Sequence, residues 1–210
     1  MNQTREVLVL GIGNVLWADE GFGVRAVEEL HARYAFPSTV TLLDGGTQGL
    51  YLYDTIASAQ RVLLFDAIDF RLSPGTLRVV RDADVPSWTT ARMSPHQNGF
   101  NDVLALARLR GEAPRQITLV GVQPDELEDL GGSLTGAVRS RIGEAVEIAA
   151  AELAQWGFAG TPREAGDAYT PLNAPALAID AYERGRPAEH DACRIGDARV
   201  LTFARYRSHR

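Results

Sequence analysis

The chain has 210 residues, of which 45% are hydrophobic and 23% are charged, and this composition excludes a largely disordered protein. All 21 basic residues are arginines, against 27 acidic residues, and a net charge of −6 without a long basic stretch argues against nucleic acid as a partner. No stretch approaches the roughly 18 consecutive apolar residues of a membrane helix, so we expect no membrane insertion. The single cysteine, Cys193, excludes an internal disulfide and favours a cytoplasmic location.

Apolar residues along the first 158 positions alternate between strand-like runs and helical spacing. In chain order, the predicted elements are a strand at Val7–Leu10, a helix at Gly21–Tyr34, a strand at Thr39–Leu43, a short helix at Gly49–Ser58, strands at Arg61–Phe65 and Gly75–Arg81, a helix at Phe100–Leu109, a strand at Gln116–Val122 and a helix at Leu134–Trp156. This alternation predicts an α/β fold, a three-layer α/β/α sandwich around a mostly parallel sheet in which one strand can be antiparallel.

Residues 161–210 differ from the rest of the chain in composition. Four prolines interrupt them, and polar residues dominate. They hold eight arginines and seven acidic residues, whereas residues 1–160 hold 13 arginines and 20 acidic residues. We therefore divide the chain into a domain at 1–160 and a polar, partly ordered C-terminal extension at 161–210. We expect this extension to contribute to partner recognition and to take no part in catalysis.

Acidic residues follow three of the predicted strands. The first strand leads to Asp19 and Glu20, the second ends at Asp44, and the third ends at Asp66. The carboxyl ends of parallel strands lie along one edge of a sheet, where ligands of α/β proteins bind. We therefore expect Glu20, Asp44 and Asp66 to approach one another at this edge, where their mutual repulsion requires a cation or a proton.

Structural roles compete with this interpretation. Asp19 can be the N-cap of the helix that follows it, Glu20 can favour the positive end of that helix dipole, and Asp44 can be an ordinary turn residue before two glycines. Asp66 directly follows a buried strand, where a carboxylate is costly unless it is paired. A functional role is therefore favoured for Asp66.

The Gly11-x-Gly13 sequence after the first strand suggests a dinucleotide site. The third glycine of that fingerprint is replaced by Leu16, however, so we expect no nucleotide cofactor.

One of the four histidines, His96, lies in a polar segment at Met93–Gly99. Together with Glu20 and Asp66 it completes a set of carboxylate and imidazole donors, which suits a divalent metal ion with coordination positions left open for water or substrate. His190 and Cys193 form only a loose pair in the extension, which is weak evidence for a metal site.

Six short motifs follow one another between residues 5 and 158. They are Gly11–Val24, Asp44–Leu50, Asp66–Asp69, Pro74–Leu77, Ser94–Gln97 and Leu119–Val122. In this order they resemble the NiFe-hydrogenase maturation endopeptidases. The stretches Leu16–Arg25 and Gly131–Leu134 are similar to the branch that serves membrane-bound uptake hydrogenases of the hydrogenase-1 type. The resemblance implies a five-stranded twisted sheet between helices, which agrees with the predicted alternation.

The resemblance also implies an activity and its residues. It implies an endopeptidase that removes the C-terminal peptide of the NiFe-hydrogenase large-subunit precursor after nickel insertion. Glu20, Asp66 and His96 match the metal-binding positions, and the metal would be nickel supplied by the precursor. Asp66 and Glu20 would be catalytic, with Asp44 as a supporting acid or base or as a hydrogen-bond partner. The enzyme would then be a metal-dependent endopeptidase of the aspartyl type.

A second hypothesis belongs to a different functional class. The protein can instead be a non-catalytic chaperone that binds the nickel-loaded large subunit and delivers it onward. Both hypotheses predict metal-sensitive binding through the same residues, but only the endopeptidase shortens the precursor.

Overall fold

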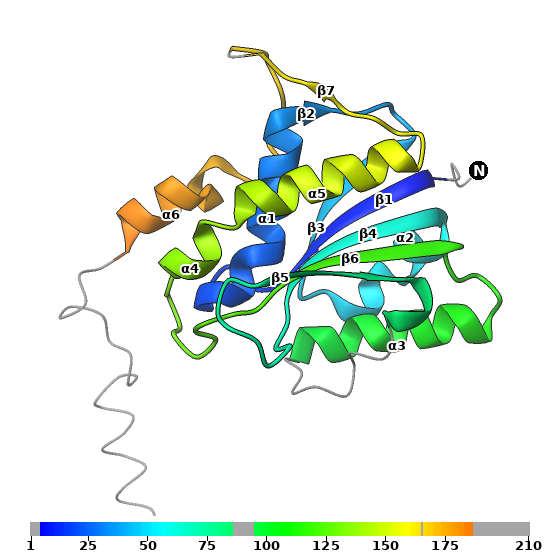
Figure 1. Cartoon of the computed structure of the whole chain (residues 1–210), viewed down its shortest axis with the longest axis horizontal. Helices are drawn as coiled ribbons and strands as arrows, with labels where there is room; N and C mark the ends of the chain where they lie inside the picture. The colour runs from blue at the N-terminus through cyan, green and yellow to red at the C-terminus, as the bar shows by residue number, and fades with distance from the viewer. Residues whose placement is uncertain (1–4, 86–94, 165, 187–210) are drawn as a thin grey trace, which may run out of the picture.

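The computed structural model describes residues 5–85, 95–164 and 166–186, and for residue 83 and residues 95–99 it describes the backbone alone. Five strands form the main sheet in the order β3-β1-β4-β6-β5 (Figure 1). The parallel strands are β1 (Arg5–Ile12), β3 (Val40–Gly46), β4 (Ala59–Ala67) and β6 (Gln116–Val122), and β5 (Leu77–Arg81) pairs antiparallel with β6. The predicted α/β fold with a mostly parallel sheet is confirmed.

Helices cover both faces of this sheet, because the side chains of each strand alternate between two apolar clusters (Figure 1). On one face, α1 (Phe22–Arg33) and α5 (Ile142–Gln155) pack against a cluster that includes Val9 and Phe65. On the other face, α2 (Tyr53–Ala57) and α3 (Pro95–Leu109) pack against a cluster that includes Leu10 and Leu64. The position of a residue within its strand therefore decides which pair of helices its side chain meets.

Short 3-10 helices complete several of the connections. They are η1 (Ala18–Gly21), η2 (Gly49–Leu52) and η3 (Asp82–Asp84). The short helix predicted at Gly49–Ser58 is η2 followed directly by α2.

The prediction of one long helix at Leu134–Trp156 is wrong, because the structure divides this segment in two. α4 (Gly136–Arg139) begins only after Thr135, whose Oγ1 accepts a hydrogen bond from the Val138 N–H at 3.4 Å. It ends at Ser140, whose hydroxyl donates to the carbonyl of Ala137 at 3.0 Å, and α5 starts anew two residues later. Hydroxyl groups that bond to nearby backbone compete with a continuous helix, and the alanine-rich pattern conceals this.

The described part of the C-terminal extension lies beside α1 and α4, on the face of the sheet that α1 and α5 cover (Figure 1). β7 (Thr161–Pro162) pairs antiparallel with β2 (Tyr34–Ala35), and η5 (Pro175–Leu177) and α6 (Ile179–Gly185) follow. Leu172 and Ile179 are half-buried against the apolar cluster below them. The division at residue 160 stays a prediction, and His190 and Cys193 lie outside the described residues.

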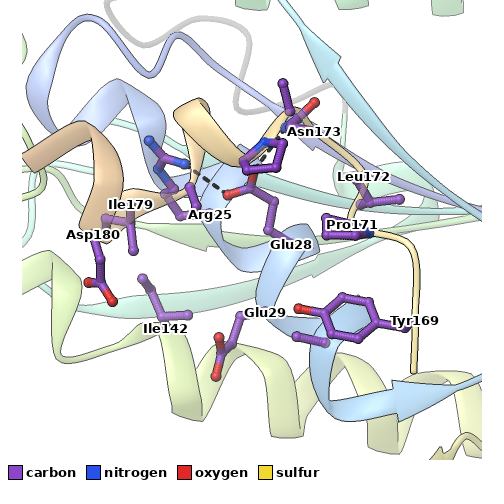
Figure 2. Close-up of a pocket in the computed structure, with 14 residues that line it drawn as sticks. Arg25, Glu28, Glu29, Ile142, Tyr169, Pro171, Leu172, Asn173, Ile179 and Asp180 are labelled. Carbon is purple, nitrogen blue, oxygen red and sulfur yellow. Dashed lines mark hydrogen bonds and ion pairs between the residues drawn. The ribbon is translucent and has the colours of Figure 1, made fainter. Parts of the chain in front are cut away.

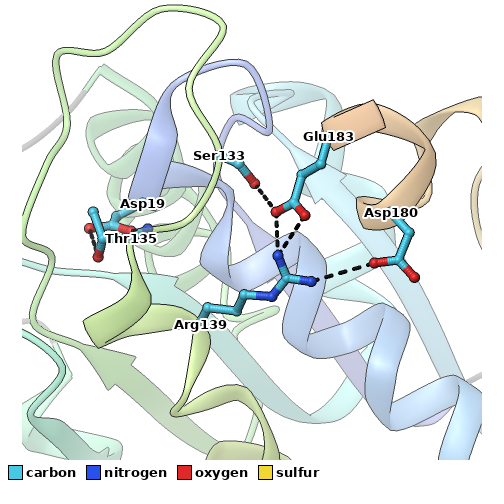
Figure 3. Close-up of polar contacts among 6 residues, drawn as sticks. All are labelled: Asp19, Ser133, Thr135, Arg139, Asp180 and Glu183. Atoms are coloured by element: carbon cyan, nitrogen blue, oxygen red, sulfur yellow. Dashed lines mark hydrogen bonds and ion pairs between the residues drawn. The ribbon is translucent and has the colours of Figure 1, made fainter. Parts of the chain in front are cut away.

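Polar contacts attach α6 to α4 (Figure 3). Arg139 Nη1 donates to Glu183 Oε2 at 2.6 Å, Arg139 Nη2 lies 3.4 Å from Asp180 Oδ1, and the Ser133 hydroxyl donates to Glu183 Oε1 at 2.7 Å. The Arg139 guanidinium lowers the pKa of Glu183, and the smaller effect of desolvation opposes it. These contacts place the end of the described extension beside the segment that precedes α4.

None of the helices within the described ranges is both long enough and apolar enough to span a membrane.

Candidate active site

Three glycines allow the first helix to approach the sheet closely at the carboxyl end of β1. A Cβ atom at Gly11 would lie 2.3 Å from the carbonyl oxygen of Gly23, and a Cβ at Gly23 would lie 2.3 Å from that of Phe65. A Cβ at Gly13, where φ is +137°, would lie 1.8 Å from the carbonyl oxygen of Glu20. The Gly11-x-Gly13 sequence thus has a packing role, which is to let the backbone of Glu20 lie directly against the end of β1.

Glu20 lies in η1, half-buried, in the loop between β1 and α1. Its N–H donates to the carbonyl of Trp17 at 2.9 Å, and its own carbonyl accepts from the N–H of Asn14 at 3.1 Å. η1 contacts β4, and the first turn of α1 rests on Phe65, the residue before Asp66. The segments that carry Glu20 and Asp66 therefore adjoin at one edge of the sheet.

Asp66 is 3% exposed near the end of β4. Its neighbours Phe65 and Ala67 belong to the cluster under α1 and α5, so strand alternation directs Asp66 to the opposite face, which α2 and α3 cover. The backbone of His96 lies in the first turn of α3. The side chain of His96 is outside the described residues, so its pairing with Asp66 stays a prediction.

Gln123, which is not among the candidates from the sequence, holds the loop that follows Asp66. This side chain is 7% exposed, and its Oε1 accepts from the N–H groups of Phe70 at 2.7 Å and Leu72 at 3.2 Å. Its Nε2 donates to Asp69 Oδ1 at 3.1 Å. A polar residue directly after a buried strand is the same signal that selected Asp66, so this residue could have been found.

Asp44 lies at the end of β3 on the other face of the sheet. In the sheet register, Asp44 pairs with Gly11 of β1, and Gly11 pairs with Phe65 of β4. Residues paired in this way point to the same face, so all three positions lie on the face covered by α1. Asp44 Oδ1 accepts from the Gly46 N–H at 2.8 Å, which is the turn role considered above. Asp44 Oδ2 accepts from Asn173 Nδ2 of the extension, also at 2.8 Å.

The expectation that Glu20, Asp44 and Asp66 converge is therefore wrong for Asp44. The three strands do end at one edge, but the pleat turns Asp44 and Asp66 to opposite faces. Within the part of the chain that the structure describes, no three His, Cys, Asp or Glu side chains are grouped closely enough to hold a metal ion. This description does not include the imidazole of His96, so the set of Glu20, Asp66 and His96 remains as predicted from the sequence.

Asp19 does not cap α1, which corrects the structural role considered for it: the N-cap position is Gly21, and no side chain caps it. Asp19 is fully buried, and its carboxylate accepts four hydrogen bonds from the loop between β6 and α4, of which Figure 3 shows those to Thr135. The donors are the N–H groups of Asp125 at 2.9 Å, Glu126 at 3.0 Å and Thr135 at 2.7 Å, and the Thr135 hydroxyl at 3.0 Å. The residue next to Glu20 thus ties its loop to the end of another strand.

The protein has an α/β fold with acidic residues near the carboxyl edge of its parallel strands, where ligands of such folds bind. A family model described as hydrogenase maturation protease matches residues 24–152. The chain therefore belongs to the hydrogenase maturation protease family.

Two relatives and one solved structure show how far the similarity extends. The hydrogenase expression/formation protein HupD of Rhodobacter capsulatus is 55% identical over 199 residues, which cover 94% of each chain. The hydrogenase 2 maturation protease of Escherichia coli is 45% identical over 160 residues, or 76% of this chain and 97% of that protein. The structure of the hydrogenase maturating endopeptidase HybD from E. coli superposes with a TM-score of 0.72 at 43% identity, covering 75% of this chain and 98% of that one.

Proposed function

We propose that this protease removes the C-terminal peptide of a NiFe-hydrogenase large-subunit precursor once nickel has been inserted. The observation that carries the proposal is the junction of two segments at the carboxyl edge of the sheet, one bearing Glu20 and the other bearing the buried Asp66, in a chain of the hydrogenase maturation protease family. The single cysteine supports action in the reducing cytoplasm.

Nickel held by the thiolates of the precursor is the recognition element in this proposal. Glu20, Asp66 and His96 supply weak oxygen and nitrogen ligands, which engage a metal that the substrate already holds and do not retain free metal. The nearly buried carboxylate of Asp66 would be one ligand of this metal when the precursor binds. When bound there, the metal would supply Lewis-acid chemistry at the scissile bond. Carboxylates do the acid and base work, which is the basis for the aspartyl-type assignment.

Intact-mass measurements on the purified precursor test the proposal. The protein should shorten the nickel-loaded precursor and leave the nickel-free precursor unchanged. Asp66→Asn and Glu20→Gln should each abolish shortening while the variants remain folded. Glu144→Gln is the matched control, because Glu144 is 56% exposed on α5 and forms an ion pair with Arg141.

Two outcomes would contradict parts of this proposal. Binding of the nickel-loaded precursor without any loss of mass would favour the chaperone hypothesis. Equal shortening of nickel-free and nickel-loaded precursor would remove nickel from recognition.

A further inference from the structure

One side chain of the extension, Asn173, reaches the carboxyl end of β3. Asn173 Nδ2 donates to Glu28 Oε1 of α1 at 2.8 Å and to Asp44 Oδ2 of β3 at 2.8 Å, so a single amide group joins two carboxylates. Asn173, Glu28 and Arg25 line a cavity of about 400 Å³ between α1 and the extension (Figure 2). Figure 2 shows Asn173 directed at Glu28, which in turn faces Arg25.

The residue type suits this position. An asparagine amide is neutral and carries two N–H donors on one nitrogen, so it satisfies two carboxylates at once without adding charge. Arg25 is 5% exposed, and its Nη1 donates to Glu28 Oε2 at 2.9 Å and to the carbonyl of Leu177. The guanidinium thereby partly compensates the charge of Glu28. Within the described residues, the Asp44 carboxylate accepts hydrogen bonds from the Asn173 amide and the Gly46 N–H, and from no arginine.

Asp44 connects Asn173 to the loop of Glu20 through the backbone. Asp44 Oδ1 holds the N–H of Gly46, and the carbonyl of Gly46 accepts from the N–H of Gly13 at 3.1 Å. The residue after Gly13 donates its N–H to the carbonyl of Glu20 at 3.1 Å, and Gly13 itself leaves no room for a Cβ against that carbonyl. This short series of hydrogen bonds is the route by which a shift of Asp44 would reach the backbone of Glu20.

We propose that Asn173 is a positioning residue, through which the C-terminal extension holds Asp44 and the turn behind Glu20 in their working arrangement. This inference rests on the proposed function. It departs from the expectation that the extension takes no part in catalysis. The HupD relative matches 94% of this chain, whereas the match to the E. coli protease covers 76% of this chain and 97% of that protein, which is too short to carry a comparable extension beyond its body.

Steady-state processing of nickel-loaded precursor by two variants tests the proposal. Asn173→Ala removes the contact with Asp44, and Glu183→Ala is the matched control, since it loosens the extension at Arg139 without touching β3. We expect Asn173→Ala to lower kcat about tenfold, roughly 1.4 kcal/mol of transition-state stabilisation, with KM unchanged. Glu183→Ala should keep both constants. An unchanged kcat in Asn173→Ala, or an equal fall in both variants, overturns the proposal.

A second variant has a readout that simple loosening of the extension does not produce. Asn173→Asp introduces a carboxyl group that faces Glu28 and Asp44, with Arg25 as the nearby cation and Glu29 and Asp180 on the same cavity wall. Neighbouring carboxylates favour its neutral form, which donates one hydrogen bond. The kcat of Asn173→Asp relative to wild type should therefore rise as the pH falls from about 8 to about 6, and a flat ratio contradicts the proposal.

The result for the wild-type protein distinguishes failure of the proposed function from failure of the role proposed for Asn173. If the wild type does not shorten nickel-loaded precursor, the proposed function fails. If it does, and the Asn173 variants match it at every pH, only the role of Asn173 fails. Thermal unfolding of each variant confirms that the comparison is made on folded protein.

Discussion

The body of the molecule and its C-terminal extension are held by different forces. The central strands are almost completely buried, with side chains such as Leu8, Leu10 and Leu63 at 0% exposure, so their stability comes from dry apolar packing. The extension has no buried residue in η5 or α6, and it is attached by polar contacts and two half-buried apolar side chains. We therefore expect the loss of one contact in the body to affect the stability of the whole domain. Single contacts of the extension should be removable without unfolding the protein.

The largest effect is expected where the body is packed most tightly. Gly23→Ala places a Cβ 2.1 Å from the carbonyl oxygen of Ile12 and 2.3 Å from that of Phe65, and neither backbone can move without distorting the sheet. We expect a loss of about 3 kcal/mol or more in the free energy of unfolding, measured with urea. Gly143→Ala is the control, because its Cβ would meet only the end of the Arg33 side chain at 3.6 Å. This control should be neutral or stabilising, and a similar loss in both variants would contradict the packing argument.

Asp19→Ala should have the next largest effect, because it leaves three backbone N–H groups and one hydroxyl without their acceptor. At about 1–3 kcal/mol for each buried group left unsatisfied, partly relieved by water, the expected loss is about 3 kcal/mol. Asp19→Asn keeps one acceptor oxygen and should lose less. Equal stability of Asp19→Ala and wild type would show that these hydrogen bonds do not hold the two loops together.

A smaller, pH-dependent effect is expected at the ion pair between β5 and α5. Arg81 Nη2 donates to Glu152 Oε2 at 2.7 Å and Thr118 Oγ1 donates to Glu152 Oε1 at 3.0 Å. The Arg81 guanidinium is the main cause that lowers the pKa of Glu152 below its ordinary value of 4.5, and desolvation opposes it. Because the pKa of Glu152 is lower in the folded state than in the unfolded state, the pair stabilises the protein at pH values above the unfolded-state pKa. This stabilisation is lost as the pH falls through the folded-state pKa.

Glu152→Gln should therefore cost about 1–2 kcal/mol at neutral pH and progressively less in acid below pH 4.5. Urea unfolding at several pH values measures this difference. Glu144→Gln, at an exposed ion pair on the same helix, should show little change at any pH. A cost at Glu152 that did not decline in acid would exclude the charged pair as its cause.

The smallest effect on stability is expected in the extension. Glu183→Ala removes the contacts with Arg139 and Ser133, and the arginine is 43% exposed, so the global free energy of unfolding should fall by less than about 1 kcal/mol. Faster amide exchange should be confined to α6 and its neighbours. A loss comparable with that of Asp19→Ala would mean that the extension is part of the cooperative core.

The sequence by itself determined the strands and helices in which apolar residues recur at a regular spacing. Strands and helices were found because each strand is a short apolar run and α1 has apolar residues at helical spacing. The positions of Asp44 and Asp66 near the ends of their strands followed from the same pattern, because each directly follows an apolar run. The motifs from Gly11 to Val122 were sufficient to indicate the family to which the chain belongs.

Only the tertiary structure decided what the individual acidic residues contact. Asp44 and Asp66 lie near the carboxyl ends of β3 and β4, the two strands on either side of β1, but their faces depend on strand register, which a list of strands does not contain. The partners of Asp19 are more than 100 residues away, and Asn173 meets Asp44 across 129 residues. Hydrogen bonds between such distant segments leave no local period in the sequence, because they depend on how whole elements pack and not on the residues beside them.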